Sequence, residues 1–229
     1  MRLVIAIALG IIGLASCGKS SETSENEFFD YFYAYDTIPK VYVYRNISNG
    51  LEEEFHRVFA INDSEGKHVV VEIYSEDGRI LEALNYNIDS LDIADHMVVN
   101  LEQENTKAVL SENQLIPMSK KDKGVFATNF PGVMDSTFFL KYIERSFVKE
   151  GKADVLGKSV PTVEFKDDII LKLYNPWKKL EDVREGKATQ IFAKGYGLVE
   201  WSSENKEVQY RLEKIISQSD FVKLMARNK

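Results

Sequence analysis

The chain has 229 residues, of which 44% are hydrophobic and 28% charged, and its formal net charge is −7. Five prolines and thirteen glycines are too few for a disordered or fibrous protein, so the composition is that of a globular protein with a substantial core. The acidic balance, with no basic stripe to offset it, argues against a nucleic-acid partner. A single cysteine excludes an internal disulfide and a cysteine-based metal site.

The first segment, residues 1–16, has the features of a secretory signal peptide. Arg2 gives it a short positive start, and an apolar stretch runs from Leu3 to Leu14. That stretch is too short to span a membrane, and it ends in the small residues Ala15-Ser16. The only cysteine of the chain, Cys17, follows directly.

The sequence Leu14-Ala15-Ser16-Cys17 closely resembles the lipobox of bacterial lipoproteins. The resemblance implies cleavage before Cys17, a thioether-linked diacylglycerol on its sulfur and an acylated amino terminus. Two or three acyl chains make a lasting anchor, because each buried methylene contributes about 0.8 kcal/mol. The predicted attachment to the membrane is therefore covalent lipid on Cys17.

The residues after the cysteine predict a spacer and then one domain. Residues 17–27 contain no large apolar side chain and are expected to form a flexible lipidated tether. Gly18 stands where an aspartate commonly signals inner-membrane retention in enteric bacteria, so the outer membrane is favoured, with the protein facing the periplasm or the surface. Residues 28–229 are predicted to form a single β-rich globular domain, although a division near residues 117–124 is an alternative.

From residue 28 onward, apolar and polar residues alternate with the period of two that is typical of β-strands. The alternation predicts strands at residues 31–35, 41–44, 55–61, 68–74, 79–88, 93–101, 107–116, 125–130, 169–174, 188–193, 197–202 and 208–216. Residues 135–150 fit a helix or a strand, and a strand is favoured. Residues 153–165 contain a glycine and a proline and predict a hairpin or an edge strand. Asp77-Gly78 is a strong hairpin signal, and residues 117–124 predict a surface crossover.

These elements define the expected fold class. About a dozen short strands with frequent turns predict a mainly β protein, built as an antiparallel half-barrel, barrel or sandwich. A short C-terminal helix is expected at residues 220–227, with Ser219 as its N-cap.

Signals for catalysis or metal binding are weak. His56, His68 and His96 show no metal-ligand spacing and are expected to be surface residues or hydrogen-bonded strand residues. The acidic runs Glu52–Glu54 and Asp167–Asp168 are of the type used in acid–base chemistry, but such runs more often lie at solvated turn ends. We therefore expect no catalytic residue, no metal and no cofactor, and a protein that is not an enzyme.

Three further patterns bear on function. The dense aromatic residues between positions 28 and 44 could line a cavity for an apolar ligand, stack on sugars, or fill an ordinary core. The motif Gly195-Tyr196-Gly197 lacks a third glycine and predicts a turn or bulge rather than a dinucleotide site. Three short Asp-Ser/Thr motifs resemble an O-glycosylation signal used on exported proteins of one Gram-negative lineage, with Thr37, Ser90 and Ser136 as the acceptors.

The C-terminal half carries a second, less specific resemblance. Val155–Phe165 and Phe192–Trp201, the latter containing Lys194-Gly195-Tyr196-Gly197-Leu198-Val199, look like segments of poorly characterised outer-membrane or periplasmic lipoproteins. Some of these share the half-barrel of lipoprotein carriers and receptors, in which a curved sheet holds acyl chains. The resemblance implies a β-rich envelope protein.

Three functions remain open from the sequence. The leading one is a non-enzymatic, lipid-anchored cell-envelope lipoprotein that binds a protein partner or an apolar ligand. The second is a carrier of hydrophobic ligands with an internal cavity. The third is a hydrolase of envelope polymers, which would use carboxylates from Glu52–Glu54 or Asp167–Asp168.

Overall fold

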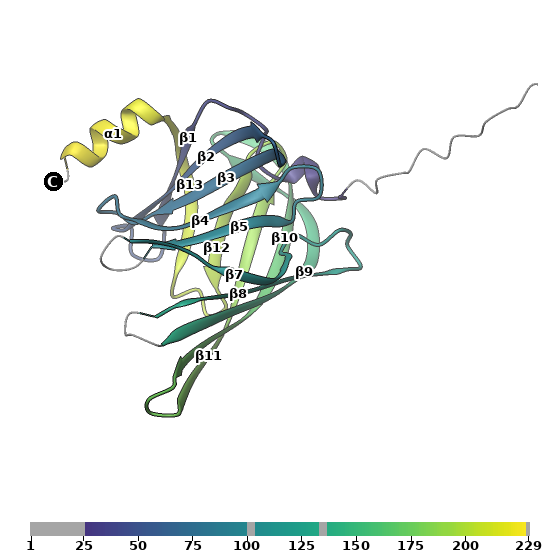
Figure 1. Ribbon diagram of the computed structural model, residues 1–229. Coiled ribbons are helices and arrows are strands. Elements are labelled where there is room, and N and C mark those ends of the chain that lie inside the picture. The colour runs from purple at the N-terminus through teal and green to yellow at the C-terminus, as the bar shows by residue number, and fades with distance from the viewer. Residues whose placement is uncertain (1–25, 100–103, 133–136, 228–229) are drawn as a thin grey trace, which may run out of the picture.

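The computed structural model describes residues 26–99, 104–132 and 137–227, which form one curved antiparallel sheet with a helix on its outer face (Figure 1). The elements in chain order are η1 (Phe29–Tyr31), β1 (Lys40–Asn46), β2 (Glu53–Asp63), β3 (Gly66–Tyr74), β4 (Ile80–Asn87), β5 (Ile93–Val99), β6 (Asn105–Lys107), β7 (Val109–Gln114), β8 (Lys123–Pro131), β9 (Phe138–Val155), β10 (Lys158–Asn175), β11 (Leu180–Ala193), β12 (Gly197–Ser203), β13 (Gln209–Ser217) and α1 (Gln218–Arg227). The predicted mainly β, antiparallel fold is confirmed.

The order of strands across the sheet is β6-β5-β4-β3-β2-β1-β13-β12-β11-β10-β9-β8-β7. The edge strands β6 and β7 are separated in sequence by Ala108 alone, so the chain passes directly from one edge of the sheet to the other. The Ala108 N–H donates to the carbonyl of His96 on β5 at 2.9 Å. Among the described strands no ladder joins β5 to β7, so the sheet curls on itself like a barrel without closing into one.

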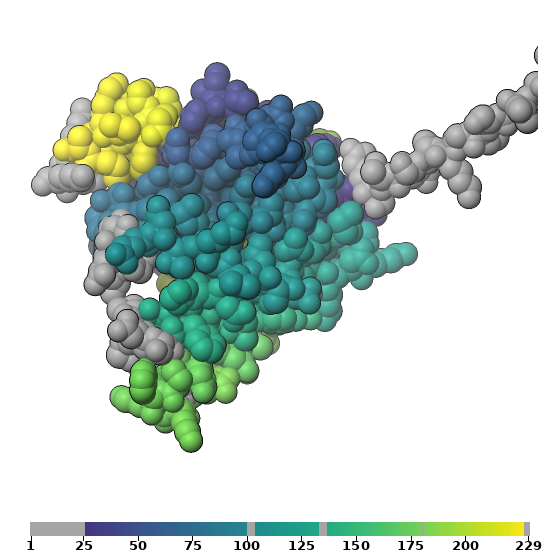
Figure 2. Space-filling model, in the orientation of Figure 1, coloured from purple at the N-terminus to yellow at the C-terminus, as the bar shows by residue number. Residues whose placement is uncertain are grey.

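Alternation along β1 shows why both faces of this part of the sheet are apolar. Successive side chains of a strand point to opposite faces. Tyr42 and Tyr44 belong to the main core on the concave face, whereas Val41 and Val43 form a second cluster on the outer face. Helix α1 covers that outer cluster with Phe221, and Figure 2 shows the helix lying against the outside of the first strands.

The C-terminal helix begins slightly earlier than predicted. Residues 220–227 are helical, as expected, but the helix starts at Gln218. Ser219 therefore lies in its first turn, and the prediction that it caps the helix is wrong. The hydroxyl of Ser217 accepts the backbone N–H of Asp220 at 3.2 Å instead. Within the described residues, no helix has the length and apolar character needed to cross a membrane.

The strand predicted at residues 31–35 is wrong, because this segment belongs to a plug at one end of the curved sheet. We call residues 26–35 the N-terminal plug. The side-chain amide of Asn26 donates to the carbonyl of Pro117 at 3.0 Å, and the Asp30 carbonyl accepts the N–H of Gly195 at 3.0 Å. The plug thus reaches from the β7–β8 loop to the β11–β12 turn. It cannot extend the sheet at β1, because both edges of β1 already pair with β2 and β13.

Aromatic packing holds the plug in place. The ring of Phe28 lies 4.9 Å from that of Phe165, measured between centroids, in an edge-on contact. Phe32 lies 4.9 Å from Tyr86. These residues are buried, so the plug forms part of the core rather than a loop resting on it.

The remaining differences concern connections. Residues 135–150 were expected as a strand, and β9 confirms this for the described residues from Phe138 onward. Residues 153–165 form a hairpin, as one of the two predictions had it, but not an edge strand, because β10 pairs with both β9 and β11. Residues 117–124 join the neighbouring strands β7 and β8, so this segment is a hairpin connection and not a crossover. The β10–β11 hairpin projects from the body of the molecule (Figure 2).

The Gly195-Tyr196-Gly197 turn has a packing role that a substitution can test. Gly197 has φ +80°, and a Cβ there would overlap the Tyr33 ring of the plug. Gly197→Ala should lower the free energy of unfolding by about 2–4 kcal/mol, through backbone strain and steric overlap. Urea unfolding measures this loss. Gly195→Ala is the matched control, because Gly195 has φ +77° but nothing within 4 Å of the added Cβ, so only about 1 kcal/mol should be lost. Equal losses in the two variants would show that the contact with Tyr33 is unimportant.

Candidate functional site

The concave face of the sheet encloses a cavity of about 290 Å³. Its lining comes from the plug and from strands all around the curl. The lining residues are Phe32, Tyr33, Glu54, His56, Val71, Ile73, Leu81, Glu82, Leu84, Tyr86, Leu115, Phe126, Lys141, Ile143, Arg145, Gln190, Phe192, Leu198 and Trp201. Most of these side chains are apolar or aromatic, and the ionisable ones are few, which is the usual character of a small-ligand site.

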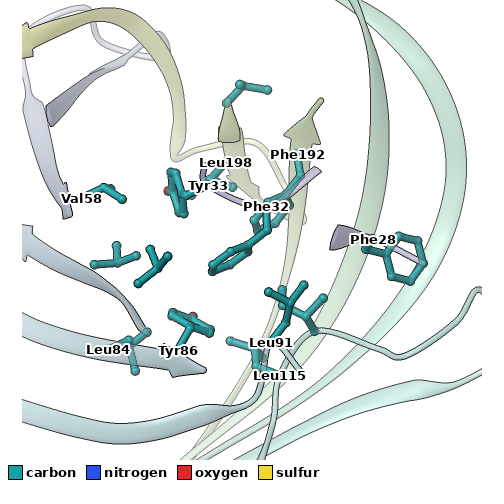
Figure 3. Packing of buried hydrophobic residues seen from close by; sticks show 14 of the residues in the cluster. Phe28, Phe32, Tyr33, Val58, Leu84, Tyr86, Leu91, Leu115, Phe192 and Leu198 are labelled. Carbon is teal, nitrogen blue, oxygen red and sulfur yellow. The ribbon is translucent and has the colours of Figure 1, made fainter. Parts of the chain in front are cut away.

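The cavity is closed at one end and open at the other. Phe32 and Tyr33 of the plug are buried at the closed end, and Figure 3 shows Phe32 at the centre of the packed aromatic and aliphatic side chains there. The other end is the mouth, where the side chains of Glu54, Glu82 and Lys141 are 21%, 23% and 25% exposed. A ligand that enters here passes these polar side chains and Leu81, which is 43% exposed.

Four side chains connect the two ends of the sheet, and we call them the closing cluster: Glu82 on β4 and Lys141 on β9, both at the mouth, with His96 on β5 and Thr128 on β8 fully buried beside them. The Lys141 ammonium lies 3.0 Å from Glu82 Oε2. His96 Nε2 lies 3.1 Å from the same oxygen, and His96 Nδ1 lies 3.1 Å from Thr128 Oγ1. Strands β4 and β5 lie near one edge of the sheet, and β8 and β9 near the other. These contacts therefore bridge the gap that the backbone ladder leaves open.

Electrostatics keep Glu82 ionised in this cluster. Burial alone would raise the pKa of its carboxyl, but the positive charge of Lys141 and the hydrogen bond from His96 outweigh burial. The net effect lowers the pKa of Glu82 far below the ordinary value of 4.5. Glu82 is thus a fixed acceptor for its neighbours and unsuited to giving up a proton near neutral pH.

A second ion pair lies deeper in the wall. Arg145 on β9 donates from Nε and Nη2 to the two carboxylate oxygens of Asp167 on β10, at 2.8 Å each. Both side chains are almost completely buried, with 2% and 1% of their surface exposed. The guanidinium carbon also lies 5.6 Å from the centre of the Phe192 ring. This bidentate geometry satisfies the buried carboxylate and compensates for removing both charges from water.

A third polar group lies beside the mouth on β2 and β12. Glu54 Oε1 lies 2.8 Å from His56 Nε2 and accepts the indole N–H of Trp201 at 3.3 Å. The Trp201 ring stacks on Tyr210 with centroids 4.7 Å apart. Gln190, the cross-strand neighbour of Trp201, completes this part of the wall. The site therefore combines an apolar interior with a polar rim.

The histidines match one of the two alternatives that the sequence left open, hydrogen-bonded strand residues, for His56 and His96. All three lie in strands, as expected, but none is a surface residue: His56, His68 and His96 are 4%, 3% and 0% exposed. Only His96 has both ring nitrogens hydrogen-bonded among the described residues. His56 and His96 point to the concave side beside the cavity. The alternative of surface histidines is wrong, because His56 and His96 face the inside of the curl and His68, on the other face of β3, is covered as well.

The acidic runs match the expectation of solvated turn ends only in part. Glu52 is exposed at the end of the β1–β2 turn, as expected, but the other acidic residues lie within strands. Asp167 is buried against Arg145 in the middle of β10, while its neighbour Asp168 points to solvent. Glu54 lines the cavity, and Glu53 on the opposite face pairs with Arg45. The two acidic runs do not converge on one cleft, because Asp167 is not among the residues that line the cavity.

Sequence reasoning missed the closing cluster and the Arg145–Asp167 pair. A signal for them was present on β9, where Lys141 and Arg145 lie on the same face of the strand as the apolar Ile143. Charged residues in phase with an apolar face indicate buried, paired charges.

The predicted modification sites are placed as follows. Cys17 and Ser136 lie outside the described residues. Thr37 is exposed, whereas the hydroxyl of Ser90 is hydrogen-bonded to Asp92. In the described ranges, no three His, Cys, Asp or Glu side chains are grouped so that they could hold a metal ion.

No protein-family model matches the chain, and no curated protein matches its sequence. Two solved structures are similar to it. A "putative lipoprotein" from Parabacteroides distasonis is 14% identical with a TM-score of 0.48, and the match covers 81% of this chain and 98% of that one. A "putative exported protein with YmcC-like fold" from Bacteroides fragilis is 12% identical with a TM-score of 0.42, and the match covers 81% and 99% of the two chains. At these values, the activity of the chain has to be argued from its own residues.

The closing cluster predicts acid sensitivity. Because the pKa of Glu82 is lower in the folded chain than its ordinary 4.5, its contribution to stability is present above about pH 5 and is lost as the pH falls below that value. Glu82→Gln should therefore cost about 2 kcal/mol at pH 7, and the difference from the unmodified chain should shrink toward pH 3. Urea unfolding across this pH range provides the measurement.

Glu150→Gln serves as the control for that experiment. Glu150 pairs with Lys120 at 2.7 Å, but their side chains are about half exposed, so the change should cost less than about 0.5 kcal/mol. If the two variants lose the same stability at every pH, the closing cluster does not hold the ends of the sheet together.

Proposed function

We propose that this chain is a lipid-anchored protein of the bacterial cell envelope that binds a small, largely apolar ligand in its cavity without transforming it chemically. The observation that carries the proposal is the cavity itself, which the plug closes at one end and a polar rim surrounds at the other. Sites of this shape bury most of a ligand's surface and orient it with a few polar groups.

The state of the ionisable residues supports binding rather than catalysis. Lys141 is neutralised by Glu82 and Arg145 by Asp167, so neither cation is free to activate a substrate. The depressed pKa of Glu82 makes it a poor general acid. These pairs fit a role in holding the wall in shape.

The position of the plug supports an orientation relative to the membrane. Asn26 lies at the closed end and follows Cys17 by about nine residues, which span at most about 30 Å when extended. In Figure 1 the described chain begins on the side opposite the β10–β11 hairpin. With lipid on Cys17, the closed end lies near the membrane and the mouth faces away from it.

The anchor can be tested by Cys17→Ser in the full-length gene. The variant should leave the membrane fraction as a folded protein, because it loses every acyl chain, and intact mass should show no lipid. Ser21→Ala, in the same spacer, should remain membrane-bound and lipidated. A Cys17→Ser protein that stays in the membrane fraction after a high-salt wash would contradict the proposal.

The cavity can be tested with a pair of substitutions on β3. Val71 lines the cavity, while Val70 lies next to it on the outer face, so Val71→Phe should fill the cavity and Val70→Phe should not. We expect Val71→Phe to lower the affinity for the neutral dye N-phenyl-1-naphthylamine at least about tenfold, through steric exclusion. Fluorescence titration gives the affinities, and thermal unfolding verifies that both variants fold. Unchanged dye binding by folded Val71→Phe would place the ligand elsewhere.

A further inference from the structure

Two polar groups that face the cavity, one end of the Arg145 guanidinium and the Tyr86 hydroxyl, have no hydrogen-bond partner in the part of the chain that the structure describes. Arg145 uses Nε and Nη2 for Asp167, and no described residue accepts the two N–H bonds of Nη1. The hydroxyl of Tyr86 on β4 likewise has no hydrogen-bond partner among the described residues. Both residues line the cavity, and each is at least nine-tenths buried.

These two groups open onto the cavity. The buried side-chain nitrogen and oxygen atoms that lack a partner in the described part of the chain belong to His56, His68 and Asn85. Arg145 Nη1 and the Tyr86 oxygen also lack a partner but are not among these fully covered atoms. Part of the surface of each atom is therefore accessible. Because so little of either residue reaches the outer surface, the open space beside these atoms is the cavity. Unpaired donors of this kind are costly unless water or a ligand satisfies them.

The two groups lie at similar depth below the mouth. Arg145 is four residues along β9 from Lys141 of the closing cluster, and Tyr86 is four residues along β4 from Glu82. Four residues of a strand span about 13 Å. The apolar side chains of the cavity wall lie in between, Leu84 on β4 among them.

Charge decides which ligand group fits. Asp167 already neutralises Arg145, so a ligand carboxylate would add a second buried negative charge with no compensating cation. Burial raises the pKa of the Tyr86 hydroxyl, against the opposing effect of the nearby Arg145 guanidinium, so the hydroxyl stays protonated and can donate. Two donors with no net charge to offer suit an uncharged acceptor.

We propose that Arg145 Nη1 and the Tyr86 hydroxyl form a subsite for an uncharged hydrogen-bond acceptor, the carbonyl of an ester or amide, which enters first and is followed by an apolar chain. This inference rests on the proposed function, since it names the ligand class for the same cavity. It assigns Arg145 and Tyr86 the role of setting specificity, and the apolar wall the role of supplying most of the affinity.

The test compares three probes of similar length on the purified full-length chain: methyl decanoate, decanoate and undecane. Displacement of N-phenyl-1-naphthylamine gives their affinities at pH 7. We expect the ester to bind about three- to tenfold more tightly than the hydrocarbon, as one or two net hydrogen bonds allow. Decanoate should bind more weakly than the ester.

Two variants connect that preference to the subsite. Tyr86→Phe should reduce the preference for the ester about threefold and leave undecane binding unchanged, because only the hydroxyl is removed. Tyr42→Phe is the matched control, since Tyr42 is a buried tyrosine of the same core that does not line the cavity. Removing Arg145 alone would leave Asp167 buried without a partner, so Arg145→Met is combined with Asp167→Leu. This folded double variant should lose the preference for the ester.

The outcomes separate the two proposals. Equal binding of ester and hydrocarbon by the unmodified chain, or an ester preference that survives both Tyr86→Phe and the double variant, would overturn the subsite while leaving a hydrophobic-ligand cavity. Tighter binding of decanoate than of the ester would show an anion site and would also overturn the inference. Failure of the folded chain to bind the dye and all three probes would overturn the proposed function itself.

Discussion

The structure depends on the closing cluster, in which Lys141 and His96 both contact the carboxylate of Glu82. An antiparallel sheet of this size twists and curls, but backbone pairing alone does not hold its ends together here. Side-chain contacts of the cluster hold the ends together instead, and Glu82 and Lys141 in it are only partly exposed. Each buried charge of the cluster has a partner of opposite charge, which offsets the cost of removing it from water. Without that pairing, this cost would favour opening of the curled sheet.

The cavity follows from this way of closing. If large apolar side chains met at the centre, the sheet would collapse into a packed core of interior density. Instead, the inward-facing residues of β9 are Lys141, Ile143 and Arg145. The two charged side chains pair with Glu82 and Asp167 on the wall and do not extend into the centre. The centre is left open, and the plug closes one end with Phe32 rather than filling the whole length.

Much of the fold was predictable from the sequence, because alternation of apolar and polar residues specifies strands locally. The turn at Asp77-Gly78 was likewise predictable from these two residues. The plug was not, since its aromatic residues alternate like a strand and only the lack of a free neighbouring edge prevents pairing. The site was not predictable either: Lys141 and Glu82 are separated by 59 positions, and Arg145 and Asp167 by 22. The period of two shows which side chains of one strand share a face, but it does not show which charged residues of different strands form pairs on that face.

The placement of charge links the wall to the kind of ligand it can take. Arg145 and Lys141 each have a carboxylate partner, so the interior offers hydrogen-bond donors without a net positive field. Glu54 at the rim is a second carboxylate there; it lies 2.8 Å from His56 Nε2 and accepts the indole N–H of Trp201. An anionic ligand would therefore meet repulsion at the mouth and an already neutralised arginine inside. An uncharged, largely apolar molecule meets neither obstacle, and its burial alone supplies a favourable free energy of about 25 cal/mol per Å².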